Sequence, residues 1–296
     1  MARLRGAGFE GKRVLVSGGS QGIGRAAASR LVRGGAHVVI AARNPERLEI
    51  AREELEAERR DPRQIVGVVV LDVDDERAIA EGVAMAVSHL GGLDVLVANQ
   101  GYAETGYFEA LPASTFEAMM RTNFFGHVAL TRAVLPHLRA SGGGAVCLVS
   151  SMLGFFGTVG YSAYAASKHA VAGFARCLRA ELRQANITVT LAYVPTTDTP
   201  GLERENRTKP ADCWALESSS AKFAPNVVAA AILDATARGR FEVVPGWSSW
   251  GIWVLYRWWP GLVRWTMDRG LERFHRQELA AGRDPRRPAL PDGAAS

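Results

Sequence analysis

The chain has 296 residues, 48% of them hydrophobic, which is enough for a sizeable core and excludes a protein that is disordered throughout. Its formal net charge of +5 comes mostly from dispersed arginines, and no basic run with interleaved aromatic residues occurs before residue 247, so no nucleic-acid partner is expected. Three unpaired-looking cysteines and no apolar leader favour a cytoplasmic protein without a disulfide framework or a metal site.

Short apolar runs rich in β-branched residues alternate along the chain with longer helix-like stretches. The runs span residues 13–16, 37–42, 65–71, 93–98, 144–150 and 187–194. Their near-continuous hydrophobicity is typical of parallel strands buried on both faces. Helices long enough for the crossovers are expected at residues 23–33, 45–60, 75–90 and 115–140. The pattern predicts an α/β fold: a Rossmann-type, doubly wound parallel sheet with helices on both faces, in one domain over residues 1–245.

A glycine-rich loop follows the first predicted strand directly. In SGGSQGIGR, residues 17–25, the loop opens into a helix. Glycines let the backbone approach a pyrophosphate, and the helix N-terminus favours its negative charge. Placed between a strand and a helix, the loop predicts a dinucleotide site rather than an ordinary tight turn. The loop residues expected to contact the cofactor are Gly18, Ser20, Gln21, Gly22, Ile23 and Gly24.

The end of the second predicted strand, IAARNPER, favours NADPH over NADH. Ala42 stands where an NAD-selective protein usually carries an acidic residue for the ribose 2′-hydroxyl. Arg43 follows directly and Arg47 lies one helical turn on, so a 2′-phosphate meets two cations. The alternative is that both arginines are solvated residues of a helix start. Asp72, after the third strand, either accepts a hydrogen bond from the adenine amine or caps the next helix.

The segment YSAYAASK, residues 161–168, carries the expected catalytic chemistry. Tyr164 and Lys168 are four residues apart and therefore share one face of a helix. A nearby ammonium lowers a phenol pKa from ~10, which makes the tyrosine a usable proton donor and acceptor. Ser151 lies thirteen residues earlier, at a strand end, where its hydroxyl can hold a substrate carbonyl. Asn123 is a polar residue within the long predicted helix, where it has a site role or simply binds water.

These motifs, in this order and spacing, resemble the short-chain dehydrogenase/reductase superfamily over nearly the whole of residues 1–245. The resemblance implies that Tyr164 protonates the carbonyl oxygen during hydride transfer and that Ser151 polarises that oxygen. It also implies that Lys168 binds the nicotinamide ribose and tunes the phenol, and that Asn123 holds a relay water. The remaining expected cofactor contacts are Val73, Asn99, Thr197 and Thr199, together with Tyr164 and Lys168 themselves.

Two positions depart from that family's pattern. The usual Asn-Asn-Ala-Gly is Ala98-Asn99-Gln100-Gly101 in this chain, and the usual Pro-Gly after the sixth strand is Pro195-Thr196. Neither change removes a catalytic group. The second is expected to alter how the following loop closes over the nicotinamide.

The loop at residues 194–210, VPTTDTPGLERENRTKP, resembles that of the 3-ketodihydrosphingosine reductases. This resemblance implies NADPH-dependent reduction of the C3 ketone of a long-chain amino ketone. Asp198, Glu203 and Glu205 offer carboxylates to the substrate ammonium, unless they only keep the loop soluble. A different hydrophobic ketone, such as a 3-oxoacyl thioester, steroid or retinoid, is the alternative substrate. A non-catalytic NADP-binding scaffold is disfavoured because the Tyr, Ser and Lys set is complete.

Six of the seven tryptophans lie at residues 247–265, within a predicted helical appendage spanning residues 246–278. Residues 243–256 carry no formal charge, a run shorter than the ~20 apolar residues that span a bilayer. Tryptophan with nearby arginine favours an interfacial segment, so we expect peripheral association with the cytoplasmic face of a membrane. The same tryptophans can instead pack on the domain or across a dimer interface. In a further alternative the chain is a membrane tether whose fold is incidental.

Two further expectations concern assembly and the end of the chain. The family resemblance implies a homo-oligomer through the helices that contain Asn123 and Tyr164. Residues 279–296, rich in Pro, Gly, Arg and Ala, are expected to form a disordered tail.

Overall fold

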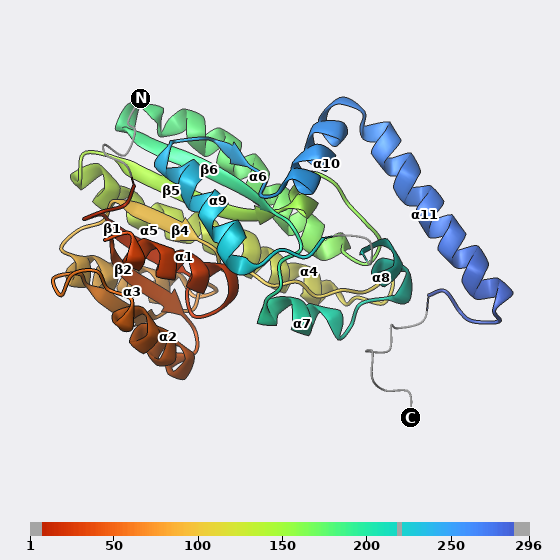
Figure 1. Ribbon diagram of the computed structural model, residues 1–296, viewed down its shortest axis with the longest axis horizontal. Coiled ribbons are helices and arrows are strands. Elements are labelled where there is room, and N and C mark those ends of the chain that lie inside the picture. The colour runs from red at the N-terminus through yellow and green to blue at the C-terminus, as the bar shows by residue number, and fades with distance from the viewer. Residues whose placement is uncertain (1–7, 218–220, 287–296) are drawn as a thin grey trace.

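The computed structural model describes residues 8–217 and 221–286, and a parallel sheet forms its centre (Figure 1). The strands are β1 (Arg13–Ser17), β2 (His37–Ala42), β3 (Val66–Val70), β4 (Val95–Ala98), β5 (Gly144–Ser151), β6 (Ile187–Val194) and β7 (Glu242–Val243). They lie in the order β3-β2-β1-β4-β5-β6-β7, and every neighbouring pair is parallel. The predicted doubly wound sheet is confirmed, with β7 as an additional short edge strand.

Helices connect the strands and extend beyond the sheet. The first group is α1 (Gly22–Arg33), α2 (Pro45–Ala57), α3 (Glu76–Leu90), α4 (Ala113–Met120), α5 (Gly126–Ala140) and α6 (Ser162–Glu181). The second group is α7 (Pro200–Asn206), α8 (Ala211–Glu217), α9 (Pro225–Ala237), α10 (Trp247–Trp258) and α11 (Pro260–Ala280). Short 3-10 turns occur at Met152–Gly154 and Arg183–Ala185.

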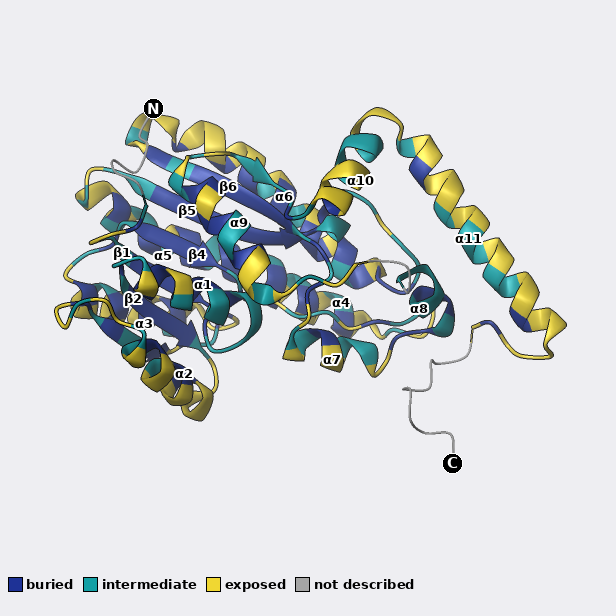
Figure 2. Ribbon diagram, in the orientation of Figure 1, coloured by how far each residue is buried: buried dark blue, intermediate teal, exposed yellow. Residues whose placement is uncertain are grey.

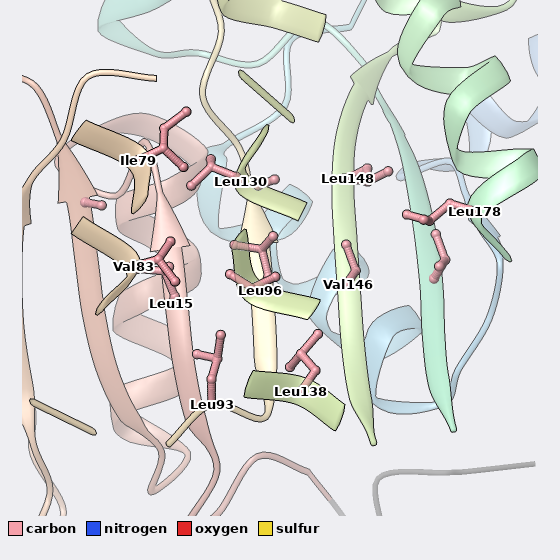
Figure 3. Packing of buried hydrophobic residues seen from close by; sticks show 14 of the residues in the cluster. Leu15, Ile79, Val83, Leu93, Leu96, Leu130, Leu138, Val146, Leu148 and Leu178 are labelled. Atoms are coloured by element: carbon pink, nitrogen blue, oxygen red, sulfur yellow. The ribbon is translucent and has the colours of Figure 1, made fainter. Parts of the chain in front are cut away.

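The core consists of two apolar layers, one on each face of the sheet. Alternate residues of each strand enter opposite layers, so Leu15 belongs to the layer shared with α3, α5 and α6, while Val16 belongs to the layer shared with α1, α2 and α9. Figure 3 shows the first layer, where Leu96 and Val146 from the strands meet Leu130 from α5. Burying each such side chain stabilises the fold by about 1.5–3 kcal/mol. This explains why the strands are apolar on both faces.

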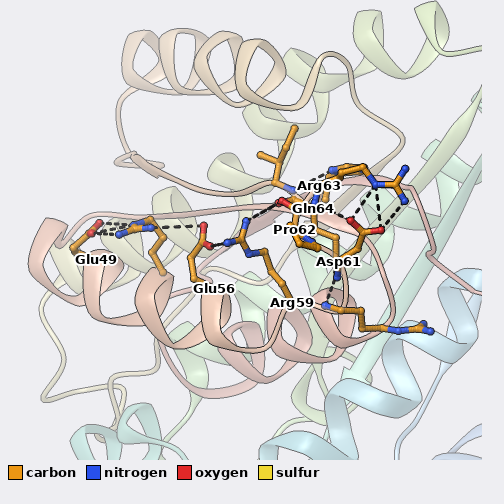
Figure 4. Close-up of polar contacts among 11 residues, drawn as sticks. Glu49, Glu56, Arg59, Asp61, Pro62, Arg63 and Gln64 are labelled. Carbon is orange, nitrogen blue, oxygen red and sulfur yellow. Dashed lines mark hydrogen bonds and ion pairs between the residues drawn. The ribbon is translucent and has the colours of Figure 1, made fainter.

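A polar turn fixes the connection from α2 to β3 (Figure 4). Figure 4 shows Gln64 beside Asp61 and Arg63 in this turn. The buried Gln64 side chain donates to the carbonyl oxygens of Val32 and Ala36, at 2.8 and 2.9 Å. Its Oε1 atom accepts from the backbone N–H groups of Arg60 and Asp61, at 2.7 and 3.0 Å. One side chain therefore satisfies four backbone groups and holds the end of α2 against the start of β2.

The predicted helix at residues 115–140 is confirmed as one helical run from Ala113 to Ala140, with a local widening inside it. A π-helical turn at Arg121–Phe125 separates α4 from α5 and contains the predicted site residue Asn123. The Asn123 side chain makes two hydrogen bonds with the backbone of Tyr102. Its Oδ1 accepts from the Tyr102 N–H at 3.0 Å, and its Nδ2 donates to the Tyr102 carbonyl at 2.9 Å. The wider turn lets this side chain reach a neighbouring loop, and periodicity alone does not reveal such contacts.

The tryptophan-rich segment forms two helices that stand beside the sheet domain (Figure 1). Figure 2 shows that much of α11 is exposed. It packs against α8, where the His275 ring lies 3.3 Å from the Asp212 carboxylate. The helix continues two residues past the predicted boundary, to Ala280. Of the predicted tail, residues 287–296 lie outside the described residues, and the division into separate units stays a prediction.

Candidate active site

A cavity of about 980 Å³ lies at the carboxyl ends of the central strands. The strand order reverses between β1 and β4, and ligands of open α/β sheets bind at such a point. The cavity extends from the glycine-rich loop past the end of β5 to α10 and α11. Its length therefore joins the predicted cofactor site to the tryptophan-rich helices.

The glycine-rich loop has the close packing that a pyrophosphate-binding turn requires. Gly18 has φ of +67°, in the left-handed region that favours glycine. A Cβ atom at Gly24 would lie 2.2 Å from the Gly18 carbonyl oxygen, so only glycine fits there. The Asn99 amide donates to that same carbonyl at 3.3 Å. These residues fit a dinucleotide cofactor, which would be held by the loop backbone and the start of α1.

Most of the predicted cofactor contacts line the cavity, and two do not. The lining set comprises Gly18, Ser20, Gln21, Gly22, Ile23, Arg43, Arg47, Val73, Asn99, Tyr164, Lys168, Thr197 and Thr199. Gly24 lies beneath the loop and allows its packing. The Asp72 carboxylate is outside the lining and accepts from the Asp74 N–H at 3.1 Å. Its contact with adenine stays a prediction, whereas its alternative role as the cap of the next helix is wrong, because Asp75 caps α3.

Two cations flank the outer part of the cofactor end. Arg43 and Arg47 are exposed, and Nη1 of Arg47 lies 3.4 Å from Oε1 of Gln21 in the glycine-rich loop. Within the part of the chain that the structure describes, neither guanidinium is ion-paired with a carboxylate. Both remain available to an anionic group at the cavity rim.

Tyr164 and Lys168 extend from one face of α6 into the cavity, as predicted. The Lys168 ammonium lies 5.7 Å from the centre of the Tyr164 ring and donates to the Val149 carbonyl at 3.2 Å. Lys168 is only 4% exposed, and this burial lowers its pKa to about 8. Burying the Lys168 ammonium with so few hydrogen-bond partners costs free energy of folding when no cofactor is bound.

The predicted acidification of Tyr164 does not hold in the protein by itself. Burial raises the pKa of the Tyr164 phenol above its ordinary value, and the Glu205 carboxylate raises it further. A hydrogen bond with Ser151 lowers this pKa, but it does not reverse the shift. Desolvation outweighs the influence expected from Lys168. The phenol is therefore protonated at neutral pH, which is the state that a proton donor needs.

The hydroxyl of Ser151, rather than that of its neighbour Ser150, meets the Tyr164 phenol. Ser150 is fully buried and donates to the Lys168 carbonyl at 3.0 Å. The Ser151 hydroxyl accepts from the Leu153 N–H at 3.2 Å and reaches the Tyr164 phenol. This geometry agrees with the assignment from the thirteen-residue spacing.

Asn123 is fully buried, and its Nδ2 also donates to the Ser167 hydroxyl at 3.0 Å. A Cβ atom at Gly101 would lie 3.0 Å from Asn123 Oδ1 and 3.1 Å from Lys168 Nζ. Glycine at this position leaves room for the Asn123 amide and the Lys168 ammonium to lie on the same side of the loop. A water between them stays a prediction.

The departure at Gln100 is accommodated by a buried network that the sequence did not reveal. Gln100 Oε1 accepts from the Ser17 hydroxyl at 2.7 Å, and its Nε2 lies 3.1 Å from His127 Nδ1. The other ring nitrogen of His127 lies 3.1 Å from the Ala98 carbonyl. Burial lowers the His127 pKa to about 3. The ring is therefore neutral, accepting from Gln100 and donating to Ala98.

The three loop carboxylates proposed for the substrate amine occupy different environments. Asp198 and Glu203 are exposed and do not line the cavity, whereas Glu205 does. Glu217, at the end of α8, lines the cavity as well and was missed. No motif marks it, because only the packing of α8 brings it near Glu205. Among the described residues, no group of His, Cys, Asp and Glu side chains is placed to hold a metal ion.

Comparison with known proteins identifies one family and several relatives. The short chain dehydrogenase family matches residues 12–210. The 3-ketodihydrosphingosine reductase of Bos taurus is 38% identical over 233 residues, covering 78% of this chain and 70% of the relative. The 3-dehydrosphinganine reductase of Danio rerio is 36% identical, with 79% and 70% covered. A Drosophila melanogaster dehydrogenase/reductase SDR family protein 7-like is 36% identical over a shorter match, 60% of this chain and 55% of the relative.

Proposed function

The chain belongs to the short chain dehydrogenase family, and we propose that this oxidoreductase reduces the C3 ketone of 3-ketodihydrosphingosine to the alcohol dihydrosphingosine. The observation that carries the proposal is the cavity itself. Tyr164, Ser151 and Lys168 line it beside the glycine-rich loop, and Ile252, Leu255, Val263 and Met267 from α10 and α11 line it as well. A reactive polar centre joined to an apolar wall suits a ketone on a long alkyl chain.

The chain's own side chains provide the proton and orient the ketone. When bound, the nicotinamide cofactor supplies the hydride. Tyr164 holds its proton at neutral pH, as a phenol with a pKa of ~10 or above does, and it donates that proton to the ketone oxygen. Ser151 donates a hydrogen bond to the same oxygen and keeps it beside the phenol. Lys168 would hold the nicotinamide ribose, and its cation would stabilise the phenolate left by proton transfer.

The direct test of this function is an assay with the purified full chain. NADPH oxidation is followed with 3-ketodihydrosphingosine and, separately, with an acetoacetyl thioester. We expect turnover of the amino ketone and formation of dihydrosphingosine as the product. Turnover of the thioester alone would assign a different hydrophobic ketone as the substrate.

We propose NADPH as the cofactor because Arg43 and Arg47 flank the cofactor end and Ala42 adds no repelling carboxylate. Replacing Arg43 with Asp introduces a negative charge where the 2′-phosphate is expected. The kcat/KM ratio of NADPH to NADH should fall about 10- to 100-fold, the equivalent of one charge-assisted contact.

The matched control is Arg60→Asp, which makes the same charge change at an exposed position outside the cavity lining. Its cofactor ratio should equal that of the unmodified protein. An unchanged ratio in the Arg43 variant would refute the proposed basis of selectivity.

We propose that α10 and α11 dock the protein on a membrane surface. Trp247, Trp258, Trp259 and Trp265 are 87%, 70%, 62% and 51% exposed, whereas Trp253 packs against the core. Over residues 8–217 and 221–286, every helix is too short or too polar to cross a bilayer. Exposed indole rings are stabilised at the headgroup boundary, and the helices that carry them also line the cavity. A lipid ketone would thus enter from the membrane.

Replacing Trp258, Trp259 and Trp265 together with Ser should reduce flotation with anionic phospholipid vesicles several-fold. These side chains are exposed, so the fold should be retained, and a melting curve verifies it. Ile50→Ser, at a 59% exposed apolar position on α2, is the matched control and should float like the unmodified protein. Equal flotation of the triple variant would show that these helices do not direct binding.

A homo-oligomer through the helices that carry Asn123 and Tyr164 also stays a proposal. Phe125, 57% exposed at the end of the π-helical turn, offers an apolar contact for a second copy.

A further inference from the structure

Four side chains form a polar cluster that the catalytic chemistry does not use. The Lys209 ammonium, fully shielded from solvent, lies 3.2 Å from Oε1 of Glu205 and 2.5 Å from Oε2 of Glu217. The Tyr161 hydroxyl lies 2.7 Å from Oε1 of Glu217 and also contacts Glu205. The cluster joins α7 and α8 to the start of α6.

The charges in this cluster do not balance. Two carboxylates face one ammonium, which leaves an excess of one negative charge when all three are ionised. Burial raises the pKa of Glu205, Lys209 opposes this shift, and the Glu217 carboxylate adds to it. Other charges nearby do not restore the balance: Asp212 lies against the His275 ring, and Arg204, which lines the same cavity, forms no ion pair with either carboxylate among the described residues. A further cation beside Glu205 would offset the cost of burying the second carboxylate.

The cluster opens into the catalytic cavity rather than into a separate space. Tyr161, Glu205 and Glu217 all line the cavity that Tyr164 lines. The Tyr161 and Tyr164 rings have their centres 6.0 Å apart, and Glu205 is close enough to raise the pKa of the Tyr164 phenol. The unbalanced charge is therefore next to the point where the ketone oxygen must lie.

The substrate class proposed above carries a cation at the matching place. In a 2-amino-3-ketone the nitrogen is three bonds from the ketone oxygen, and at bond lengths of about 1.2–1.5 Å the two atoms are within about 4 Å. A ketone held by Tyr164 and Ser151 thus brings its ammonium toward Tyr161 and Glu205. The alkyl chain is left to the apolar wall of α10 and α11.

We propose that Glu205 and Glu217 bind the ammonium group of the substrate and make the protein selective for 2-amino ketones. This inference rests on the proposed function and adds the groups that set its specificity. Lys209 keeps the two carboxylates together, and Tyr161 orients them by its hydroxyl. Glu205 and Glu217 are specificity-determining residues, since neither exchanges a proton with the ketone.

The test compares two ketones of equal chain length, 3-ketodihydrosphingosine and its analogue without the amino group. The unmodified full chain should prefer the amino ketone in kcat/KM. Glu205→Gln keeps the shape but removes the charge, and should lower kcat/KM for the amino ketone about 10- to 100-fold, mainly through KM. The ratio of kcat/KM for the amino ketone to that for the analogue should therefore fall about 10-fold or more, since any effect of Glu205 on the Tyr164 phenol acts on both ketones alike. Glu217→Gln should act in the same direction.

Glu203→Gln is the matched control, an exposed position on the same helix outside the cavity lining, and it should leave both substrates unaffected. A melting curve for each variant separates loss of fold from loss of selectivity. A second test uses only the unmodified chain, with a substrate whose nitrogen is acetylated and therefore uncharged. This substrate should be reduced as poorly as the analogue without the amino group.

If Glu205→Gln lowered kcat/KM equally for both ketones, or for neither, the inference would be overturned. A cluster that only holds α7 and α8 in place would not distinguish the two ketones. Equal turnover of both ketones by the unmodified chain would overturn it and leave the proposed function standing. Failure of the unmodified chain to reduce the amino ketone would instead refute the proposed function.

Discussion

Replacing Tyr164 with Phe is expected to lower kcat for ketone reduction by about 10²- to 10⁴-fold, the range of a positioned proton donor. The ring and its packing on α6 are kept, while the hydroxyl that meets Ser151 is lost. Cofactor affinity, measured by quenching of tryptophan fluorescence, should change far less than kcat, because Tyr164 is only one of the expected cofactor contacts and the glycine-rich loop is unchanged. The loss should therefore appear in kcat rather than in cofactor binding.

Tyr256→Phe is the appropriate control, because it removes a phenol hydroxyl that does not line the cavity. Tyr256 packs against Phe155 and Phe156, and its variant should keep full activity. If Tyr164→Phe reduced the ketone at the unmodified rate, another group would have to supply the proton and the mechanism would be wrong.

Replacing Lys168 with Met is expected to abolish most activity and to stabilise the protein without its cofactor. The Lys168 pKa is about 8 in the folded chain against an ordinary 10.5, so burial of the ammonium opposes folding at pH 7. That difference corresponds to about 3 kcal/mol at about 1.4 kcal/mol per pH unit, less about 1 kcal/mol for the lost hydrogen bond to Val149. The free energy of unfolding should therefore rise by about 2 kcal/mol.

The pH dependence gives this prediction a definite sign. Between pH 8 and 10.5 the unfolded chain binds more protons at Lys168 than the folded chain does. Its contribution to the free energy of unfolding therefore rises with pH across this window, and the Met variant lacks that rise. Urea unfolding at pH 7 and above pH 10 measures the free energy of unfolding of both proteins. The difference between them should be smaller at the higher pH.

Lys222→Met, at an exposed position, should change the free energy of unfolding by less than about 0.5 kcal/mol. A Lys168 variant that is less stable at pH 7 would show that contacts of the ammonium outweigh its burial. The expected gain in stability would come with a loss of activity, since the buried, poorly paired Lys168 cation destabilises the fold but serves the reaction.

The sequence by itself determined the sheet, the glycine-rich loop and the placement of Tyr164 and Lys168 on one helical face. The apolar runs end within two residues of β1 to β6, because strands buried on both faces leave no other pattern. Tyr164 and Lys168 share a helical face because four residues make about one turn. Gly18 and Gly24 are required by local backbone geometry, which is encoded within a few residues.

Contacts between distant segments were decided only by the tertiary structure. The raised pKa of Tyr164 depends on burial and on Glu205, 41 residues along the chain. Glu205 and Glu217 come together only around Lys209, which contacts both carboxylates, and Asn123 in the π-helical turn bonds the backbone of Tyr102 in a separate loop. Local periodicity reports which face of an element is apolar. Desolvation and charge balance depend on which elements meet, and only the folded arrangement sets them.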